Sequence, residues 1–153
     1  NNFENVKKYL EDGGNIIVTH DHWMNLQGNI DKILNVKLVF KKDFIPGYKA
    51  RILNNSHSIF RSFYNLNLEK NSLINIAPTH NTFLKYNDMN DFNKDVLIEL
   101  DDGIHGEYLL VKEFGRGKLI YWNAGHSYNN FAFSDIKEIE QKLFMNFIYW
   151  ICD

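Results

Sequence analysis

The stretch GGNIIVTHDHW, residues 13–23, is the part of the sequence that most strongly decides the fold. Its two glycines precede residues 15–19, a run of mainly apolar and β-branched residues with no polar alternation. Such a run is typical of a central strand buried on both faces, as in a parallel sheet. His20, Asp21 and His22 follow at once, so groups that can exchange protons or bind metals stand at the carboxyl end of this strand.

The rest of the chain supplies alternating helix and strand patterns. Helical spacing of apolar residues predicts a helix over 2–12, which Gly13-Gly14 ends with one glycine in a left-handed conformation. Ser134 predicts the N-cap of a last helix that runs to the end and holds the single cysteine, Cys152, as a small buried residue. Gly115-Arg116-Gly117 indicates a hairpin turn. We expect strands over 15–19, 36–40, 72–77, 82–86, 96–100, 107–114 and 118–122, with 41–72 largely irregular.

Composition limits the classes of protein to consider. The 153 residues suit one domain, and 44% hydrophobic residues with 15% aromatics indicate a globular core. A net charge of −2 gives no basic excess for nucleic-acid binding. No apolar run is long enough for a membrane span, and the polar start does not resemble a signal peptide. We therefore expect neither nucleic acid nor membrane as a partner, and the sequence leaves the compartment open.

Two segments together resemble a known family. YLEDGGNIIVTHDHW near the start and EFGRGKLIYWNAGHS near the end, followed by a helix ending NFIYWICD, are similar to the ThuA-like branch of the class I glutamine amidotransferase-like superfamily. Between them, NNSHSIFRSF resembles the family's "HPI" segment, with Ser58 where proline is usual. The order and spacing match over most of the chain, and residues 60–105 match weakly. The resemblance implies that residues 1–153 form a single ThuA-like, amidotransferase-like α/β domain.

The resemblance also implies a fold, and it shows that N-terminal strands typical of the superfamily are missing from this sequence. The expected fold is flavodoxin-like, a three-layer α/β arrangement with a mostly parallel sheet and an antiparallel extension. The superfamily's N-terminal strands have no counterpart here, and a buried strand close to the start needs neighbours on both sides. Either later strands flank this strand, or an upstream segment or a second chain completes the sheet, and in the second case the chain is the C-terminal part of a larger domain.

The chain departs from the superfamily where glutamine is hydrolysed. His20 stands where a true amidotransferase carries its cysteine nucleophile, and His126 stands near the superfamily's catalytic histidine. Ser127 and Tyr128 follow His126 in place of the expected acid. Thioester chemistry needs a thiolate, and Cys152 belongs to a different element. Glutamine amidotransferase activity is therefore not expected.

Three hypotheses remain for the polar residues after the two strands. If the strands are parallel neighbours, His20, Asp21, His22 and His126 meet at the carboxyl edge of the sheet, where α/β proteins bind ligands. In the first hypothesis His20, Asp21 and His126 carry out acid–base catalysis, while His22, Trp23, Ser127 and Tyr128 contact the substrate, and Trp122 offers a further face for a sugar. In the second, His20, His22 and His126 bind a divalent metal. In the third, all of them close the strand ends structurally.

Two functions from different classes follow. The first is a pocket for a small polar molecule, and the resemblance suggests a carbohydrate or a derivative. The second is a non-catalytic interaction or structural domain of a larger protein that has lost the superfamily's nucleophile. Whether the chain is an enzyme, and which cofactor it uses, stays open at this point.

Overall fold

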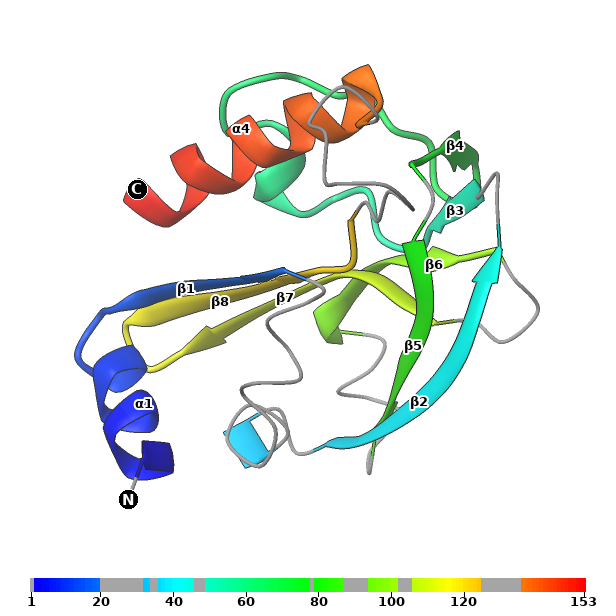
Figure 1. Ribbon diagram of the computed structural model, residues 1–153. Helices are drawn as coiled ribbons and strands as arrows, with labels where there is room; N and C mark the ends of the chain where they lie inside the picture. The colour runs from blue at the N-terminus through cyan, green and yellow to red at the C-terminus, as the bar shows by residue number, and fades with distance from the viewer. Residues whose placement is uncertain are drawn as a thin grey trace.

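The structure is a computed structural model that describes residues 2–19, 32–33, 36–45, 49–77, 79–86, 94–101, 106–124 and 136–153. Its elements, in chain order, are α1 (Asn2–Glu11), β1 (Asn15–Thr19), β2 (Val36–Ile45), β3 (Lys49–Ile52), the 3-10 helix η2 (Ser58–Phe60), β4 (Leu73–Asn75), β5 (Thr79–Tyr86), β6 (Val96–Leu100), β7 (Glu107–Phe114), β8 (Gly117–Trp122) and α4 (Glu138–Cys152). Six strands form an open sheet in the order β1-β8-β7-β6-β3-β4, and β2 pairs with β5 in a second sheet (Figure 1). The chain is thus an α/β domain with an open mixed sheet.

The glycine pair makes the turn that the sequence predicted. Gly13 has a φ of +103°, and the N–H groups of Gly13 and Gly14 donate to the carbonyls of Leu10 and Tyr9. These two bonds form a Schellman motif, which satisfies carbonyls that the end of α1 leaves open. A Cβ on Gly14 would lie 2.3 Å from the end of the exposed Tyr9 ring, which would have to turn aside. The turn sends the chain directly into β1.

The direction of the strands corrects the expected mostly parallel sheet. Among the described strands, β1 and β8 pair in parallel, whereas β8–β7, β7–β6, β6–β3 and β3–β4 are antiparallel. A two-residue turn joins β7 to β8, and residues 101–106 join β6 to β7. Connections this short cannot provide a parallel crossover, which takes a dozen or more residues. The parallel part of the sheet is therefore its β1–β8 edge.

The β7–β8 turn packs against the end of α1. Gly115, the first turn residue, has a φ of +63°, which glycine adopts without strain. A Cβ on Gly117 would lie 2.2 Å from the carbonyl oxygen of Gly14 and 2.3 Å from that of Leu10. Arg116 donates to the carbonyl of Asp12 at 2.9 Å. The Gly-Arg-Gly stretch is thus the predicted hairpin turn, and its glycines allow close backbone contact.

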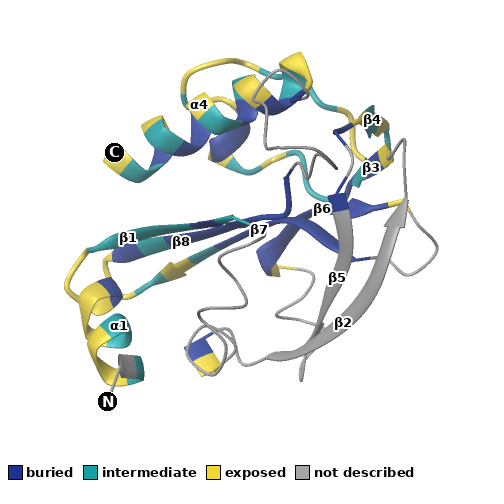
Figure 2. Cartoon of the chain, in the orientation of Figure 1, coloured by how far each residue is buried: buried dark blue, intermediate teal, exposed yellow. Residues whose placement is uncertain are grey.

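The two long helices pack on opposite faces of the sheet. Val18, Leu119 and Tyr121 belong to a buried cluster with Leu10 of α1, whereas alternate strand residues such as Ile120 belong to the cluster that includes α4. Since successive strand residues point to opposite faces, the two clusters lie on the two sides of the sheet. Figure 2 shows the buried residues concentrated in β6, β7, β8 and the inner face of α4.

Other elements differ from the sequence prediction. β3 lies within the region expected to be irregular, and β2 and β5 are longer than expected. Helix α4 begins at Glu138 with Lys137 as its N-cap, and Ser134 lies outside the described residues. Cys152 is exposed and not buried as expected, because it lies in the last turn of α4 on the side away from the sheet.

Candidate functional site

The parallel pairing brings together the two strands that precede the predicted site residues. Thr19, the last residue of β1, is the register partner of Trp122, the last residue of β8. Neighbouring strands lie about 4.8 Å apart, so the two segments leave the same edge of the sheet side by side. The condition on which the shared site depended, that the two strands are parallel neighbours, is therefore met.

The predicted site residues themselves are not placed. They are His20, Asp21, His22, Trp23, His126, Ser127 and Tyr128, and they lie outside the described residues. The catalytic, ligand-binding and metal-binding roles considered for them therefore stay predictions. Within the described ranges, no group of three His, Cys, Asp or Glu side chains is arranged to hold a metal ion.

A buried polar network lies next to the carboxyl end of β8. Asn123, the residue after β8, is fully buried, and its N–H donates to the carbonyl of Tyr108 at 2.9 Å. The hydroxyl of Thr79 is also fully buried and contacts the backbone oxygen of Asn123 at 2.9 Å and its side-chain oxygen at 2.8 Å. The start of β5 is thereby fixed to the end of β8, so the segment that leads to His126 departs from a rigid position.

A fully buried carboxylate extends this network into α4. Glu140 accepts hydrogen bonds from the N–H of Ala77 at 2.9 Å, the N–H of Lys137 at 2.7 Å and the hydroxyl of Tyr108 at 2.5 Å. Burial and the Glu140 carboxylate raise the pKa of the Tyr108 phenol well above its usual value of 10. Tyr108 is therefore a neutral hydrogen-bond donor at ordinary pH, and the pair stabilises the core without taking part in proton transfer.

Sequence analysis did not single out this network. The sequence pattern that could have revealed it is the position of Glu140 on the apolar face of α4, in line with Leu143 and Phe147, which are both fully buried. A glutamate at the third position of a helix that aligns with core residues indicates a capping role, because it can accept the N–H of the N-cap residue. Thr79 and Asn123 offer no comparable pattern, since both follow short apolar runs like many loop residues.

Trp122 does not have the role considered for it. Its ring stacks on Phe144 at 5.8 Å and meets Phe147 edge-on at 5.3 Å, and only 4% of the residue is exposed. These contacts with α4 occupy the ring, so it is a core residue and cannot offer an open face to a sugar. Its indole N–H is buried without a hydrogen-bond partner among the described residues.

The single thiol is far from this edge. Cys152 is exposed at the end of α4, and the neighbouring carbonyl of Ile151 accepts a hydrogen bond from the side chain of Asn15 at 2.6 Å. Asn15 is the first residue of β1, whereas the candidate site follows Thr19, the last one. At about 3.3 Å a residue, the two ends of β1 are roughly 13 Å apart.

Comparisons with known proteins show the fold. Neither a scan against protein-family models nor a search of curated proteins gives a match. Among solved structures, the chain is similar to Cytoplasmic Protein STM1381 from Salmonella typhimurium LT2, with a TM-score of 0.65 and 14% identity over 98% of this chain and 60% of that chain. Cytoplasmic Protein STM3548 from Salmonella typhimurium gives a TM-score of 0.60 and 14% identity, over 97% of this chain and 59% of that chain.

A third similar structure belongs to a much longer protein. It is a β-galactosidase from Rahnella sp. R3, with a TM-score of 0.56 and 10% identity over 97% of this chain and 20% of that chain. The chain thus spans about 60% of the length of the two Salmonella proteins and a fifth of the β-galactosidase. At these identities the likeness shows a shared α/β open-sheet fold. The part of the chain that the structure describes contains no helix long and apolar enough to cross a membrane.

Proposed function

We propose that this chain is a ThuA-like, flavodoxin-like three-layer domain that binds a small polar molecule of carbohydrate type at the carboxyl edge of β1 and β8. The pairing of Thr19 with Trp122 is the observation that carries this proposal, because it starts the two histidine-bearing segments side by side. Ligands of open α/β sheets bind at this edge of parallel strands. In the proposed site His20 and His126 exchange protons with the ligand, and Asp21 orients a neighbouring imidazole.

The proposed site has no glutamine amidotransferase activity. That reaction needs a thiolate nucleophile, and the only cysteine in the sequence is Cys152, at the opposite end of the sheet. Imidazole and carboxylate groups remain, and they suit the recognition and protonation of hydroxyl-rich molecules. The β-galactosidase similar in structure acts, by its name, on a carbohydrate, which is in keeping with a carbohydrate-type ligand.

Ligand-observed NMR of the chain with a panel of monosaccharides tests the proposal. We expect saturable binding of at least one sugar, and weaker binding in both H20N and H126N, since each removes an imidazole from one shared site. H105N serves as the matched control, because His105 belongs to the β6–β7 connection and to neither segment. Equal sugar binding by all three variants would place the ligand elsewhere.

A second candidate function is a non-catalytic domain within a larger protein. It is favoured by the likeness to a fifth of a β-galactosidase, since there the same fold occurs as one part of a longer chain. In this case no sugar in the panel binds, and H20N and H126N leave every measured property except local stability unchanged. Stable association with an upstream segment, added as a separate polypeptide, would support this function directly.

A further inference from the structure

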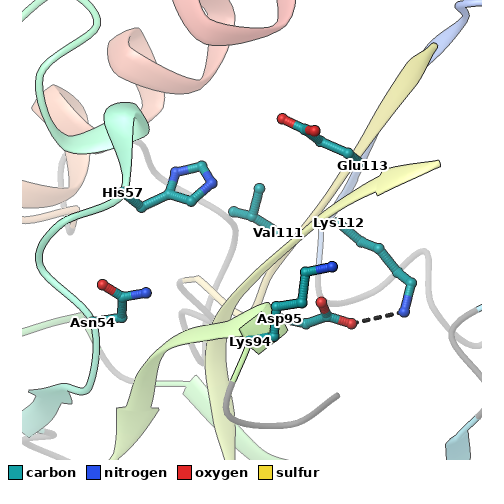
Figure 3. Close-up of a pocket in the computed structure, with 7 residues that line it drawn as sticks. All are labelled: Asn54, His57, Lys94, Asp95, Val111, Lys112 and Glu113. Atoms are coloured by element: carbon teal, nitrogen blue, oxygen red, sulfur yellow. Dashed lines mark hydrogen bonds and ion pairs between the residues drawn. The ribbon is translucent and has the colours of Figure 1, made fainter. Parts of the chain in front are cut away.

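A pocket of about 340 Å³ opens beside the last residues of β7, away from the proposed carbohydrate site. We call it the β7 pocket; the residues that line it include Asn54, His57, Lys94, Val111 and Glu113 (Figure 3). Its volume lies at the lower end of the roughly 300–1,000 Å³ that ligand pockets occupy. The β7 pocket is therefore large enough for a small metabolite.

Strand register explains why the pocket exists. β6 begins at Val96, opposite Leu110, whereas β7 continues to Phe114. The last residues of β7 thus extend past the strand beside them, and the loop that contains Asn54 and His57 stands across the space (Figure 3). Glu113 pairs with Lys118, which in turn pairs with Asn15 at the start of β1. The β7 pocket therefore lies at the opposite end of the sheet from the edge formed by Thr19 and Trp122.

Two uncharged hydrogen-bond donors face the pocket from the loop. The side-chain oxygen of Asn54 accepts from the N–H and the hydroxyl of Ser56, at 3.0 and 2.7 Å, which fixes the amide and leaves its NH₂ group for a ligand. Nδ1 of His57 accepts from the N–H of Ile59 at 3.2 Å. Burial lowers the pKa of His57 below 6.5, with Glu113 opposing the shift, so the ring is neutral and carries its proton on Nε2.

Two opposite charges in the pocket have no ion-pair partner among the described residues. Lys112 and Asp95 neutralise each other through a contact of 2.8 Å. Lys94 and Glu113 form no such pair, and Figure 3 shows them on different sides of Val111, with Glu113 toward His57. Lys118, across from Glu113, instead donates to the carbonyl of Trp150 at 2.5 Å. One ammonium and one carboxylate thus stay available at separate positions of one small pocket.

We propose that the β7 pocket binds a small zwitterion of the α-amino acid type. The ligand's carboxylate accepts hydrogen bonds from Lys94 and Asn54, and its ammonium group lies against Glu113. Two lysines and two acidic residues leave the lining neutral overall, which suits a ligand of zero net charge and disfavours a phosphate dianion. His57 Nε2 supplies a further donor to the ligand's carboxylate or side chain.

NMR titration of the ¹⁵N-labelled chain with three probes tests the proposal. The probes are L-alanine, N-acetyl-L-alanine, which lacks the ammonium group, and L-alaninamide, which lacks the carboxylate. We expect saturable shifts of pocket amides with L-alanine and roughly fivefold weaker binding of each modified probe, because an exposed ion pair contributes up to about 1 kcal/mol.

Charge variants locate the contacts. In E113Q the advantage of L-alanine over N-acetyl-L-alanine disappears, and in K94Q its advantage over L-alaninamide disappears. Both residues are exposed, so neither change disturbs folding. E69Q and K70Q make the same charge changes at exposed positions outside the pocket and keep both preferences.

Three results would overturn the proposal. One is the absence of saturable shifts at pocket amides with L-alanine. Another is equal binding of all three probes by the unmodified chain. The last is the persistence of both preferences in E113Q and K94Q, which would place the zwitterion at another site. None of these results bears on sugar binding at the far edge of the sheet, so the two proposals fail independently.

Discussion

Replacing Glu140 tests how the candidate site is held in place. This fully buried carboxylate accepts the N–H groups of Ala77 and Lys137 and the hydroxyl of Tyr108, at 2.9, 2.7 and 2.5 Å. It therefore joins the start of α4, the segment before β5 and the start of β7. E140A removes both acceptor oxygens, and with them all three hydrogen bonds, and leaves a buried N–H and a buried hydroxyl without this partner.

The size of the effect follows from these contacts. Each buried donor left without a partner costs about 1–3 kcal/mol, and relief from burying a charge offsets part of that sum. We expect E140A to lower the free energy of unfolding by about 4 kcal/mol, a large share of the roughly 5–15 kcal/mol typical of a domain. E140Q keeps one acceptor oxygen, and the Tyr108 hydroxyl can turn to accept from the amide, so the expected loss is about 1–2 kcal/mol.

Urea denaturation followed by circular dichroism measures both variants, and E138Q is the matched control. Glu138 is exposed and pairs with Lys142 within α4, so its replacement should change stability little. The double variant Y108F/E140Q reports the coupling between phenol and carboxylate. A loss below about 0.5 kcal/mol for E140A would refute the reasoning, because it would mean that these buried donors find other partners at no cost.

Three further predictions concern other parts of the fold. Burial lowers the pKa of His57 in the folded state, so the contribution of this residue to stability is present above pH 6.5 and is lost as the pH falls through the folded-state pKa. H57N keeps an acceptor for the N–H of Ile59 and removes the titrating group. In thermal melts at decreasing pH, H57N should therefore lack the part of the stability loss that His57 causes. G117A should destabilise the chain by about 3 kcal/mol in urea, since the added Cβ overlaps the backbone oxygen of Gly14, and unchanged stability would contradict the observed packing. K112M should lower the free energy of unfolding by about 3 kcal/mol, because it leaves Asp95, which is 3% exposed, as an unpaired buried charge. Adding D95N to K112M should recover most of the loss. A K112M chain as stable as the parent would show that the ion pair is not needed.

Local patterns in the sequence predicted most of the elements. The Gly13-Gly14 turn, β1, β6, β7, β8 and both long helices were predicted, because each has a strong periodicity or a turn with a defined backbone requirement. The place of β1 was predicted wrongly: it is an edge strand of the six-stranded sheet, half-buried except at Val18, and not a central strand buried on both faces. β3 was not predicted, since Lys49–Ile52 is short and lies between Pro46-Gly47 and a run of asparagines. Its strand conformation depends on pairing with β4 and β6, which are distant in sequence.

The relative direction of most strands in the sheet was predicted wrongly for a physical reason. Val96–Leu100 is buried along its whole length, so it lacks the alternation that usually distinguishes an antiparallel strand. In this sheet both faces are covered, one by α4 and the other by α1 and Ile33, so antiparallel strands also look uniformly apolar. The short connections before and after β7 were better evidence for antiparallel strands, because they are too short for a parallel crossover.

The candidate site was predicted only at the level of the strands that lead to it. The sequence indicated a strand before each of the two polar segments, and the register shows that these strands, which end at Thr19 and Trp122, are parallel neighbours. The network around Glu140 and the β7 pocket could not be predicted, because each brings together residues from at least three separate parts of the chain. Such sites depend on tertiary packing that local spacing does not encode.

A crystal structure of the chain soaked with the best-binding monosaccharide tests the central claim most directly. The proposed function predicts sugar density at the carboxyl edge of β1 and β8, within hydrogen-bond distance of both the His20 and the His126 imidazoles. Sugar bound elsewhere, or the two imidazoles more than about 12 Å apart with separate hydrogen-bond partners, would contradict a shared site.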